Sequence, residues 1–511
     1  MPKLPSSKLF HLVKSLSGSE KRYFKMYISG KEKDNSKYVQ LFDAIDEMEE
    51  FDDGALKKNI YGDEPIESRK YPGLKAYLYN LILKSLVSYD EKSSVDYKLK
   101  NMLLGVRSLF KRSQFAGCKD ILKKAKKLAA EYEDFSALLE LLDWEKKIAY
   151  TQTDIAFLDR EMGRIEEEEN GYLQQLRDIS EYRNIFFRIL VNIRKDVSRN
   201  KKQLSLLKGL VQNPLMADEE KANSFIAKIL FHRIKSIYYF SSSQFHEFYE
   251  INKKLLALIE GNMRMLKEDV SEYISALSNH IVSCGILGKY GEVNETLRKL
   301  ISVKPLTNDD AVKIHRQYYS NKFRLCIATG EFEAGRQELK RHLTYLSKFD
   351  ARPFQKSDFY FQYFCIYFGS EEFEKALESL NEWLDMSKSI ERKDLQSFAR
   401  VLNMIVHYEL GNTLLLESLF RSTSRHLGKG DKIIKLEKKI IGFILQAGKP
   451  ISKKEQILLF KELKKDVEKI AALPSYNIFR MFDLMSWIDS KITGKPFSKV
   501  VKEKYRKNNT N

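Results

Sequence analysis

One short pattern constrains the fold of this chain more than any other, because it recurs at a nearly constant interval. A cysteine stands four residues before a glycine at Cys284–Gly288, Cys326–Gly330 and Cys365–Gly369, and successive glycines are 42 and then 39 residues apart. In each copy an aromatic residue follows the glycine, and a leucine comes seven residues after that aromatic: Tyr290 and Leu297, Phe332 and Leu339, Phe373 and Leu380. A repeat near 40 residues predicts helical hairpins that stack on their neighbours, because one hairpin cannot bury its own apolar face.

The same frame extends beyond these three copies. Phe115 is followed by Cys118 and Leu122 at the same offsets, and a further turn is predicted at Gly411, 42 residues after Gly369. Only 10 Pro and 23 Gly interrupt the 511 residues, and apolar residues recur at spacings of three and four. Because 43% of the residues are hydrophobic, the chain can bury a core. We therefore expect an all-α protein.

The pattern resembles the tetratricopeptide family. Gly330, Phe332, Gly335 and Leu339 match the order of glycine, aromatic, small and large residues in that family's repeat, and the unit beginning at Gly288 matches it as well. The resemblance implies a right-handed α-solenoid of helical hairpins whose first helices line a concave groove. The period exceeds the usual length of about 34 residues, so longer helices or loops are expected.

The chain divides by pattern into three predicted parts: a small helical N-terminal domain at 1–96, the repeats at 97–428, and a basic C-terminal helical cap and tail at 429–511. In the first part, Ser17 and Glu20 have the spacing of a capping box, Asp52 or Asp53 is expected to cap a short helix, and Pro65–Gly73 is expected to be a loop before a helix at 74–86. In the last part, Met481, Leu484 and Trp487 form an apolar stripe that would close the array, and Lys499–Asn511 is expected to be a frayed tail. The register between 150 and 240 is left open.

No motif in the sequence predicts a catalytic, metal-binding or cofactor-binding site. None of the eight histidines has zincin spacing, no C-x-x-C pair occurs, and the glycine-rich segment Gly442–Lys449 has the wrong spacing for a phosphate-binding loop. We therefore predict no cofactor, no metal and no enzymatic activity, and we interpret the cysteines as small buried side chains kept reduced. Without a continuous apolar leader or a stretch of about 18 apolar residues, the expected location is the cytoplasm and no membrane span is expected.

Two functional hypotheses follow. The first is a scaffold that binds a protein or peptide segment, acidic or aromatic-bearing, along its concave face. The resemblance places eight residues in that groove: Arg107, Gln317, Ser320, Arg324, Lys356, Phe359, Tyr363 and Tyr367. Arginine supplies forked charged donors and tyrosine a large contact area with a polar tip, which suits such a partner. Ordinary solvated surface is the competing interpretation for each of them.

The second hypothesis is a regulator that contacts nucleic acid through its N-terminal helices. Residues 1–96 offer four cations for phosphate contacts, namely Arg69, Lys70, Lys75 and Lys84, but Asp63, Glu64 and Glu67 lie close by in the sequence. The formal net charge of +18 is concentrated elsewhere, since residues 429–511 hold 20 Lys and Arg against 9 Asp and Glu. A basic surface can attract nucleic acid, yet a solvated lysine-rich surface explains the same composition.

Overall fold

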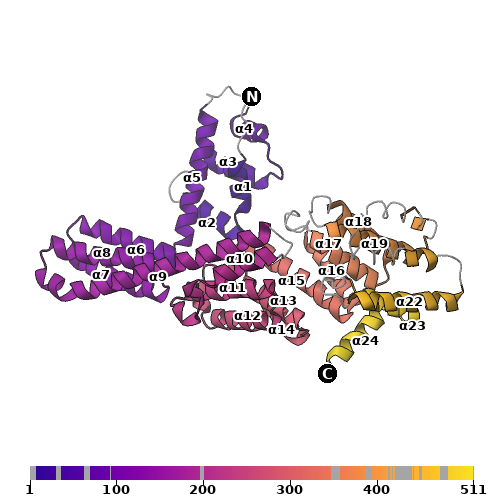
Figure 1. Cartoon of the computed structure of the whole chain (residues 1–511). Coiled ribbons are helices and arrows are strands. Elements are labelled where there is room, and N and C mark those ends of the chain that lie inside the picture. Colours follow the sequence, from indigo (N-terminus) through magenta and orange to yellow (C-terminus); the bar gives the residue numbers. More distant parts are fainter. Residues whose placement is uncertain are drawn as a thin grey trace. The chain divides into compact units, whose positions relative to one another are not determined.

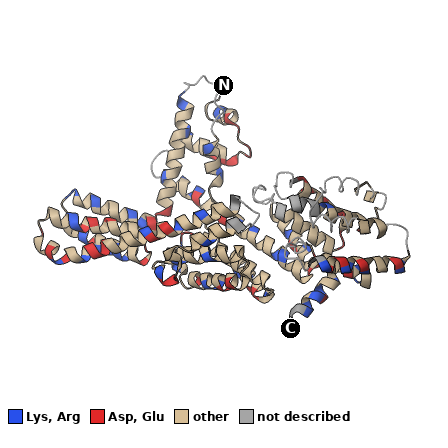
Figure 2. Ribbon diagram, viewed as in Figure 1, with Lys and Arg blue, Asp and Glu red and all other residues tan. Residues whose placement is uncertain are grey.

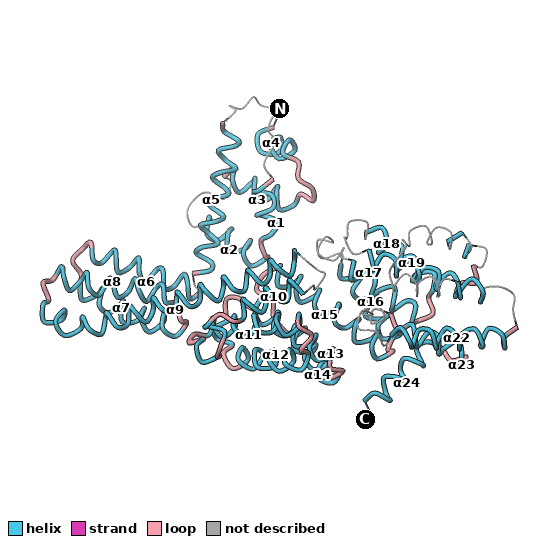
Figure 3. Tube along the Cα trace, in the orientation of Figure 1, coloured by secondary structure: helices cyan, strands magenta, loops and turns pink. Residues whose placement is uncertain are grey.

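A computed structural model of the chain describes residues 7–29, 36–62, 69–91, 94–195, 201–346, 357–386, 393–412, 415–416, 418–419, 440, 442–447, 452–471 and 482–509. Every regular element in these ranges is a helix (Figure 3), which confirms the prediction of an all-α chain. Backbone contacts divide the chain into two compact units. The first comprises Met1–Glu181 and Asn223–Phe225, and the second comprises Tyr182–Ala222 and Ile226–Asn511.

This division does not coincide with the boundaries drawn from the sequence. The predicted boundary at 96/97 falls in the first turn of a helix, α6, and the one at 428/429 lies outside the described residues. The three-part organisation therefore stays a prediction.

The first unit begins with five helices around one core. They are α1 (Lys8–Ser15), α2 (Gly18–Ser29), α3 (Lys37–Glu47), α4 (Asp53–Tyr61) and α5 (Lys70–Asp90). Phe24 and Phe42 meet in this core with ring centroids 4.6 Å apart, and Leu78 of α5 is fully buried in it. The helix expected at 74–86 lies within α5.

The predicted caps of these helices are present. The Ser17 N–H donates to Glu20 Oε2 at 2.6 Å and the Glu20 N–H donates to Ser17 Oγ at 3.3 Å, which is the reciprocal pair of a capping box. Asp52 accepts from the first backbone N–H groups of α4. The loop predicted at Pro65–Gly73 extends too far, because α5 already begins at Lys70.

The rest of the first unit is a run of antiparallel helices. They are α6 (Val95–Phe110), α7 (Phe115–Glu131), α8 (Phe135–Thr151) and the long α9 (Ile155–Lys195), which continues into the second unit. Figure 1 shows α6, α7 and α8 side by side. Cys118 and Leu122, placed in the repeat frame from the sequence, are both buried in their core together with Trp144.

The second unit continues the hairpins. Its elements are α10 (Lys201–Val211), the short 3₁₀ turns η1 (Pro214–Met216), η2 (Glu219–Lys221) and η3 (Met263–Leu266), α11 (Phe225–Ser241), α12 (Phe245–Glu260), α13 (Ser271–Ile286), α14 (Tyr290–Ser302), α15 (Asn308–Thr329), α16 (Phe332–Leu346), α17 (Ser357–Gly369), α18 (Phe373–Met386), α19 (Lys393–Glu409), α22 (Lys453–Ala471), α23 (Leu484–Thr493) and α24 (Phe497–Asn509). Within this unit α13 packs on α15, and α15 packs on α17. The first helices of successive hairpins are therefore neighbours.

Contacts between neighbouring hairpins join residues close to one repeat apart. Ser271 Oγ donates to Asp310 at 3.2 Å, and the Lys299 ammonium binds Glu260 at 2.9 Å. Both pairs are separated by 39 residues in the sequence, three fewer than the 42 between the turn glycines Gly288 and Gly330. Corresponding parts of successive hairpins thus lie against each other.

One backbone turn recurs at the hairpins of both units. A residue with φ between 52° and 75° is followed by a residue whose N–H donates to the carbonyl five positions earlier, which is the Schellman arrangement that closes a helix C-terminus. The residues with positive φ are Ser113, Glu133, Thr153, Ser243, Gly288, Gly330, Glu371 and Gly411. Where the next helix is described, it starts two residues later, at Phe115, Phe135, Ile155, Phe245, Tyr290, Phe332 or Phe373. This turn, and not glycine itself, is the repeated unit.

The third cysteine and glycine of the sequence pattern occupy a different place from the first two. In the first two turns the carbonyl that accepts the closing hydrogen bond belongs to Cys284 and to Cys326. In the α17–α18 turn the residue with positive φ is Glu371, and the accepting carbonyl belongs to Tyr367. Cys365 is therefore two residues out of register with Cys284 and Cys326, although the sequence pattern aligns all three. All four cysteines are nevertheless buried and free, as predicted.

The C-terminal part ends in a packed helix and not in the expected frayed tail. Residues Phe497–Asn509 form α24, the terminal yellow helix of Figure 1. The Tyr505 ring lies 5.4 Å from that of Tyr290, and a Cβ built on Gly330 would lie 2.9 Å from Lys502 N. The helix therefore rests against two of the recurrent turns. Leu484 and Trp487 are buried as predicted, whereas Met481 lies outside the described residues.

Candidate functional site

Two of the predicted groove residues hold neighbouring first helices together. Ser278 Oγ of α13 donates to Gln317 Oε1 of α15 at 2.8 Å, and Gln362 Nε2 of α17 donates to the Ser320 carbonyl at 3.1 Å. Gln317 and Ser320 are half-buried. Their side of α15 thus carries the polar contacts that fix α13, α15 and α17 in register.

The other predicted residues divide by exposure. Arg324 is exposed one turn further along α15, and Tyr367 is half-buried near the end of α17. Phe359 and Tyr363 are only 3% and 6% exposed, because they pack in a core between α15, α16 and α17. In this conformation they support the surface and do not face solvent.

The last two positions stand apart from this set. Lys356 lies outside the described residues. Arg107 is exposed on α6 of the first unit, whereas the rest belong to the second unit. The structure therefore brings Gln317, Ser320 and Arg324 together along one helix, and partner binding by any of the eight stays a prediction.

A buried polar chain lies beneath this surface. His315 Nε2 is 3.0 Å from His342 Nδ1, and His342 Nε2 is 2.6 Å from the Tyr363 hydroxyl. Phe359 stacks on the His342 ring at 5.1 Å. Burial lowers the pKa of His315 to about 4 and that of His342 to about 3, so both imidazoles are neutral near pH 7. These three side chains link α15, α16 and α17 through buried hydrogen bonds.

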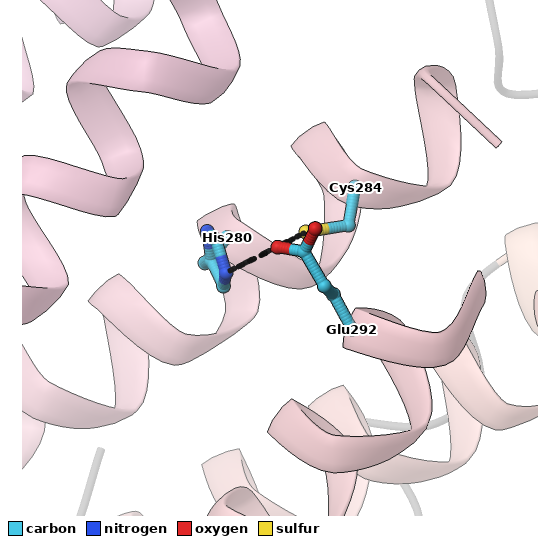
Figure 4. A group of neighbouring side chains, drawn as sticks. All are labelled: His280, Cys284 and Glu292. Carbon is cyan, nitrogen blue, oxygen red and sulfur yellow. Dashed lines mark hydrogen bonds and ion pairs between the residues drawn. The ribbon is translucent and has the colours of Figure 1, made fainter. Parts of the chain in front are cut away.

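A second polar group occurs at the α13–α14 hairpin, where Figure 4 shows His280, Cys284 and Glu292 turned toward one another. His280 Nε2 lies 3.5 Å from Cys284 Sγ and 3.8 Å from Glu292 Oε2, and Cys284 Sγ lies 3.8 Å from the same oxygen. His280 and Cys284 are buried, whereas the Glu292 side chain is 38% exposed. Within the described part of the chain, these three residues are the group arranged so that it could hold a metal ion.

Sequence reasoning missed this group, although one signal was present. His280 and Cys284 are four residues apart and so share a helix face, but the zincin pattern requires two histidines at that spacing and does not include a histidine with a cysteine. Glu292 joins them across the turn at Gly288, and nothing in a one-dimensional pattern predicts that approach. The prediction that the chain holds no metal stays a prediction.

A cavity of about 360 Å³ lies among α17, α18, α19, α23 and α24. Its wall includes the Glu409 carboxylate, which accepts from Trp487 Nε1 at 2.6 Å and from the Lys491 ammonium at 2.5 Å. Both oxygens of this carboxylate are therefore engaged in fixing α23 to α19. We assign the cavity a packing role.

The cations invoked for nucleic-acid binding are partly occupied. Lys75 binds Asp53 at 2.7 Å and lies over the Tyr71 ring, while Arg69 and Lys84 are exposed. Figure 2 shows Lys and Arg prevailing along α24, where Lys504 binds Asp483 at 2.8 Å. Nucleic-acid binding stays an alternative prediction that no contact among the described residues favours.

Comparisons with known proteins add no identification, since no model of a known family and no curated protein matches the chain. None of the described helices combines the length and apolar character needed to cross a bilayer. The likeness to tetratricopeptide repeats therefore stays a resemblance of pattern.

Proposed function

We propose that the chain is a non-enzymatic, cytoplasmic scaffold whose hairpins form a right-handed solenoid similar to tetratricopeptide arrays, and that it binds a protein or peptide segment along its first helices. The observation that carries this proposal is the pairing of residues close to one repeat apart, seen at Ser278–Gln317 and at Ser271–Asp310. Such pairing places the same face of successive helices side by side, and an extended partner can run across that surface.

The exposed part of α15 sets the chemistry of the partner. Arg324 is exposed, Lys313 and Arg316 are half-buried on the same helix, and Tyr367 of α17 is half-buried. An acidic segment with an aromatic residue would complement these groups, because guanidinium forks bind carboxylates and tyrosine offers area with a polar tip. Phe359 and Tyr363 would support this surface from beneath.

The cysteines support the proposed compartment. All four are free and buried. Thiols that stay reduced are typical of cytoplasmic proteins.

The test uses the full-length protein, purified through an affinity tag from its native cell. Arg324→Glu reverses a charge on α15, and Arg298→Glu makes the same change at an exposed position of α14. We expect Arg324→Glu to reduce recovery of a specific partner at least about ten-fold, as charge reversal at an interface does, while Arg298→Glu retains it. Equal recovery by both variants, each shown to be folded by circular dichroism, would contradict the proposed surface.

A further inference from the structure

We propose that His280, Cys284 and Glu292 form a binding site for a divalent transition-metal ion, with Zn²⁺ as the expected occupant. The site is independent of the proposed scaffold function, because it lies within one hairpin and needs no partner. It joins the end of α13 to the start of α14.

The geometry fits an ion of this kind. Bonds of about 2.0–2.3 Å to nitrogen, oxygen and sulfur, arranged as a tetrahedron, hold the ligand atoms about 3.4–3.6 Å apart. The three separations here are 3.5, 3.8 and 3.8 Å. Closing on an ion would need shifts of only a few tenths of an ångström.

The fold brings the three ligands together by local rules. His280 and Cys284 are one helical turn apart on α13, so their side chains lie one above the other. Gly288 then takes φ +72°, which reverses the chain and starts α14 at Tyr290. Glu292 is in the first turn of α14 and therefore faces the end of α13.

A second layer of contacts orients the carboxylate. The Tyr249 hydroxyl of α12 donates to Glu292 Oε2 at 2.8 Å, and the Lys289 ammonium lies 3.4 Å from the other oxygen, Oε1. Oε2 is thereby directed at the His280 nitrogen and the Cys284 sulfur. The Tyr249 ring also stacks on the His280 ring at 5.8 Å. Contacts of this kind fix metal ligands in their binding orientation.

The chemistry of the ligand set selects the ion. Imidazole, thiolate and carboxylate together suit Zn²⁺ better than Mg²⁺ or Ca²⁺, which prefer oxygen ligands alone. A thiolate and a carboxylate balance its two charges. The Glu292 side chain is partly exposed, so solvent reaches the site at this ligand, and water is the expected fourth ligand.

The next hairpin provides an internal comparison. Cys326 occupies the same place relative to its turn as Cys284, because each carbonyl accepts the closing bond. Lys322 and Ala334 stand there in place of His280 and Glu292. The neighbouring thiol is equally buried but has no partner ligands at these two positions, so it serves as a matched control.

The experiment titrates the reduced, full-length, chelator-treated protein with Co²⁺, whose thiolate complexes absorb in the near ultraviolet. We expect one Co²⁺ per chain with this absorption, displaced by Zn²⁺, present in Cys326→Ser and absent in Cys284→Ser. Absence of the absorption in the wild type, its persistence in Cys284→Ser or its loss in Cys326→Ser would overturn the proposal.

A second variant covers the case in which Cys284→Ser does not fold. Glu292→Gln changes a partly exposed side chain and should fold, which circular dichroism checks. We expect it to weaken Zn²⁺ binding at least ten-fold, measured by competition with a chromophoric chelator. Tyr249→Phe should weaken binding about ten- to a hundred-fold, as loss of an orienting contact does. Unchanged affinity in Glu292→Gln would overturn the site.

Discussion

The ring of Phe332 lies so close to the Cα of Gly369 that a Cβ built on Gly369 would overlap it. Gly369 does not have positive φ, so the glycine is required by this close approach and not by a turn. The contact joins the start of α16 to the end of α17 and brings two successive hairpins within van der Waals distance.

Gly369→Ala should therefore destabilise the protein. The added methyl group must displace a fully packed aromatic ring, and overpacking of this kind costs about 1–3 kcal/mol. Urea unfolding followed by circular dichroism measures the loss. Gly285→Ala on α13 is the control, because a Cβ there meets nothing within 4 Å, and it should leave stability unchanged or slightly raise it. Equal effects of the two changes would contradict the close packing.

The recurrent turn predicts two substitutions with opposite effects. Thr153 is exposed with φ 54°, so Thr153→Gly should relieve strain and raise the free energy of unfolding by about 1 kcal/mol. Gly288 has φ +72° and room for a Cβ. Gly288→Ala should therefore lower the free energy of unfolding by about 1–2 kcal/mol through backbone strain and not through a steric clash. Denaturant titration of both variants checks the signs. The same sign for both would show that positive φ does not limit stability at these turns.

These turns also explain how far the sequence could be interpreted. The aromatic and leucine frame predicted the hairpins correctly, because those residues start the second helix and bury its face. Glycine marks only some of these turns. Ser113 and Glu371 adopt positive φ although they are not glycine, so the sequence gives no signal for the turns at these two positions. For the same reason Cys365 was placed two residues out of register.

The predicted and missed sites differ in what determines them. Gln317 and Ser320 were correctly placed on the first helix, but their contacts with the neighbouring helices depend on the packing of three hairpins. Burial of Phe359 and Tyr363 arises from that same packing. The packing of α24 was hidden by its many lysines, although Phe497 and Val501, one helical turn apart, are both buried.

Stability should fall in mild acid because of the His315–His342 pair. Burial lowers both pKa values, to about 4 and about 3, whereas the unfolded chain binds these protons near pH 6.5. The stability that the neutral pair contributes to the folded state is therefore fully present above about pH 6.5 and is lost as the pH falls toward 4. Urea unfolding at several pH values measures this loss. As the pH falls, the free energy of unfolding should decrease less steeply in the double variant His315→Gln, His342→Gln than in the exposed control His246→Gln. Identical pH profiles would contradict this assignment.

The four thiols should react slowly in the native protein. Burial raises the pKa of Cys326 to about 11, and it raises the pKa values of Cys118 and Cys365 as well, while Cys284 is fully buried. Little thiolate is then present at pH 8, and reagents cannot reach the sulfur. Labelling with and without denaturant measures the difference. An added cysteine at exposed Ser302 should label rapidly in both conditions, and rapid native labelling of all four original thiols would contradict their burial.

Phe497 should be the residue that holds α24 on the second unit. Its ring is 8% exposed and lies 5.5 Å from Phe332, 5.6 Å from Phe368 and 5.8 Å from Phe482. Phe497→Ala should cost about 3–5 kcal/mol, because it removes a buried aromatic side chain and leaves a cavity among three others. Hydrogen exchange should show faster exchange along α24 in this variant.

The control for α24 is Phe187→Ala, which removes a ring that is 59% exposed on α9. It should change stability by less than about 1 kcal/mol, because little apolar area returns to water. If Phe497→Ala is as mild as this control, and exchange along α24 does not change, the helix is held by its ion pairs instead, of which Lys502–Glu331 at 3.3 Å reaches one of the recurrent turns. Such pairs weaken in high salt, whereas the aromatic cluster does not, so a salt titration of the wild type separates the two causes.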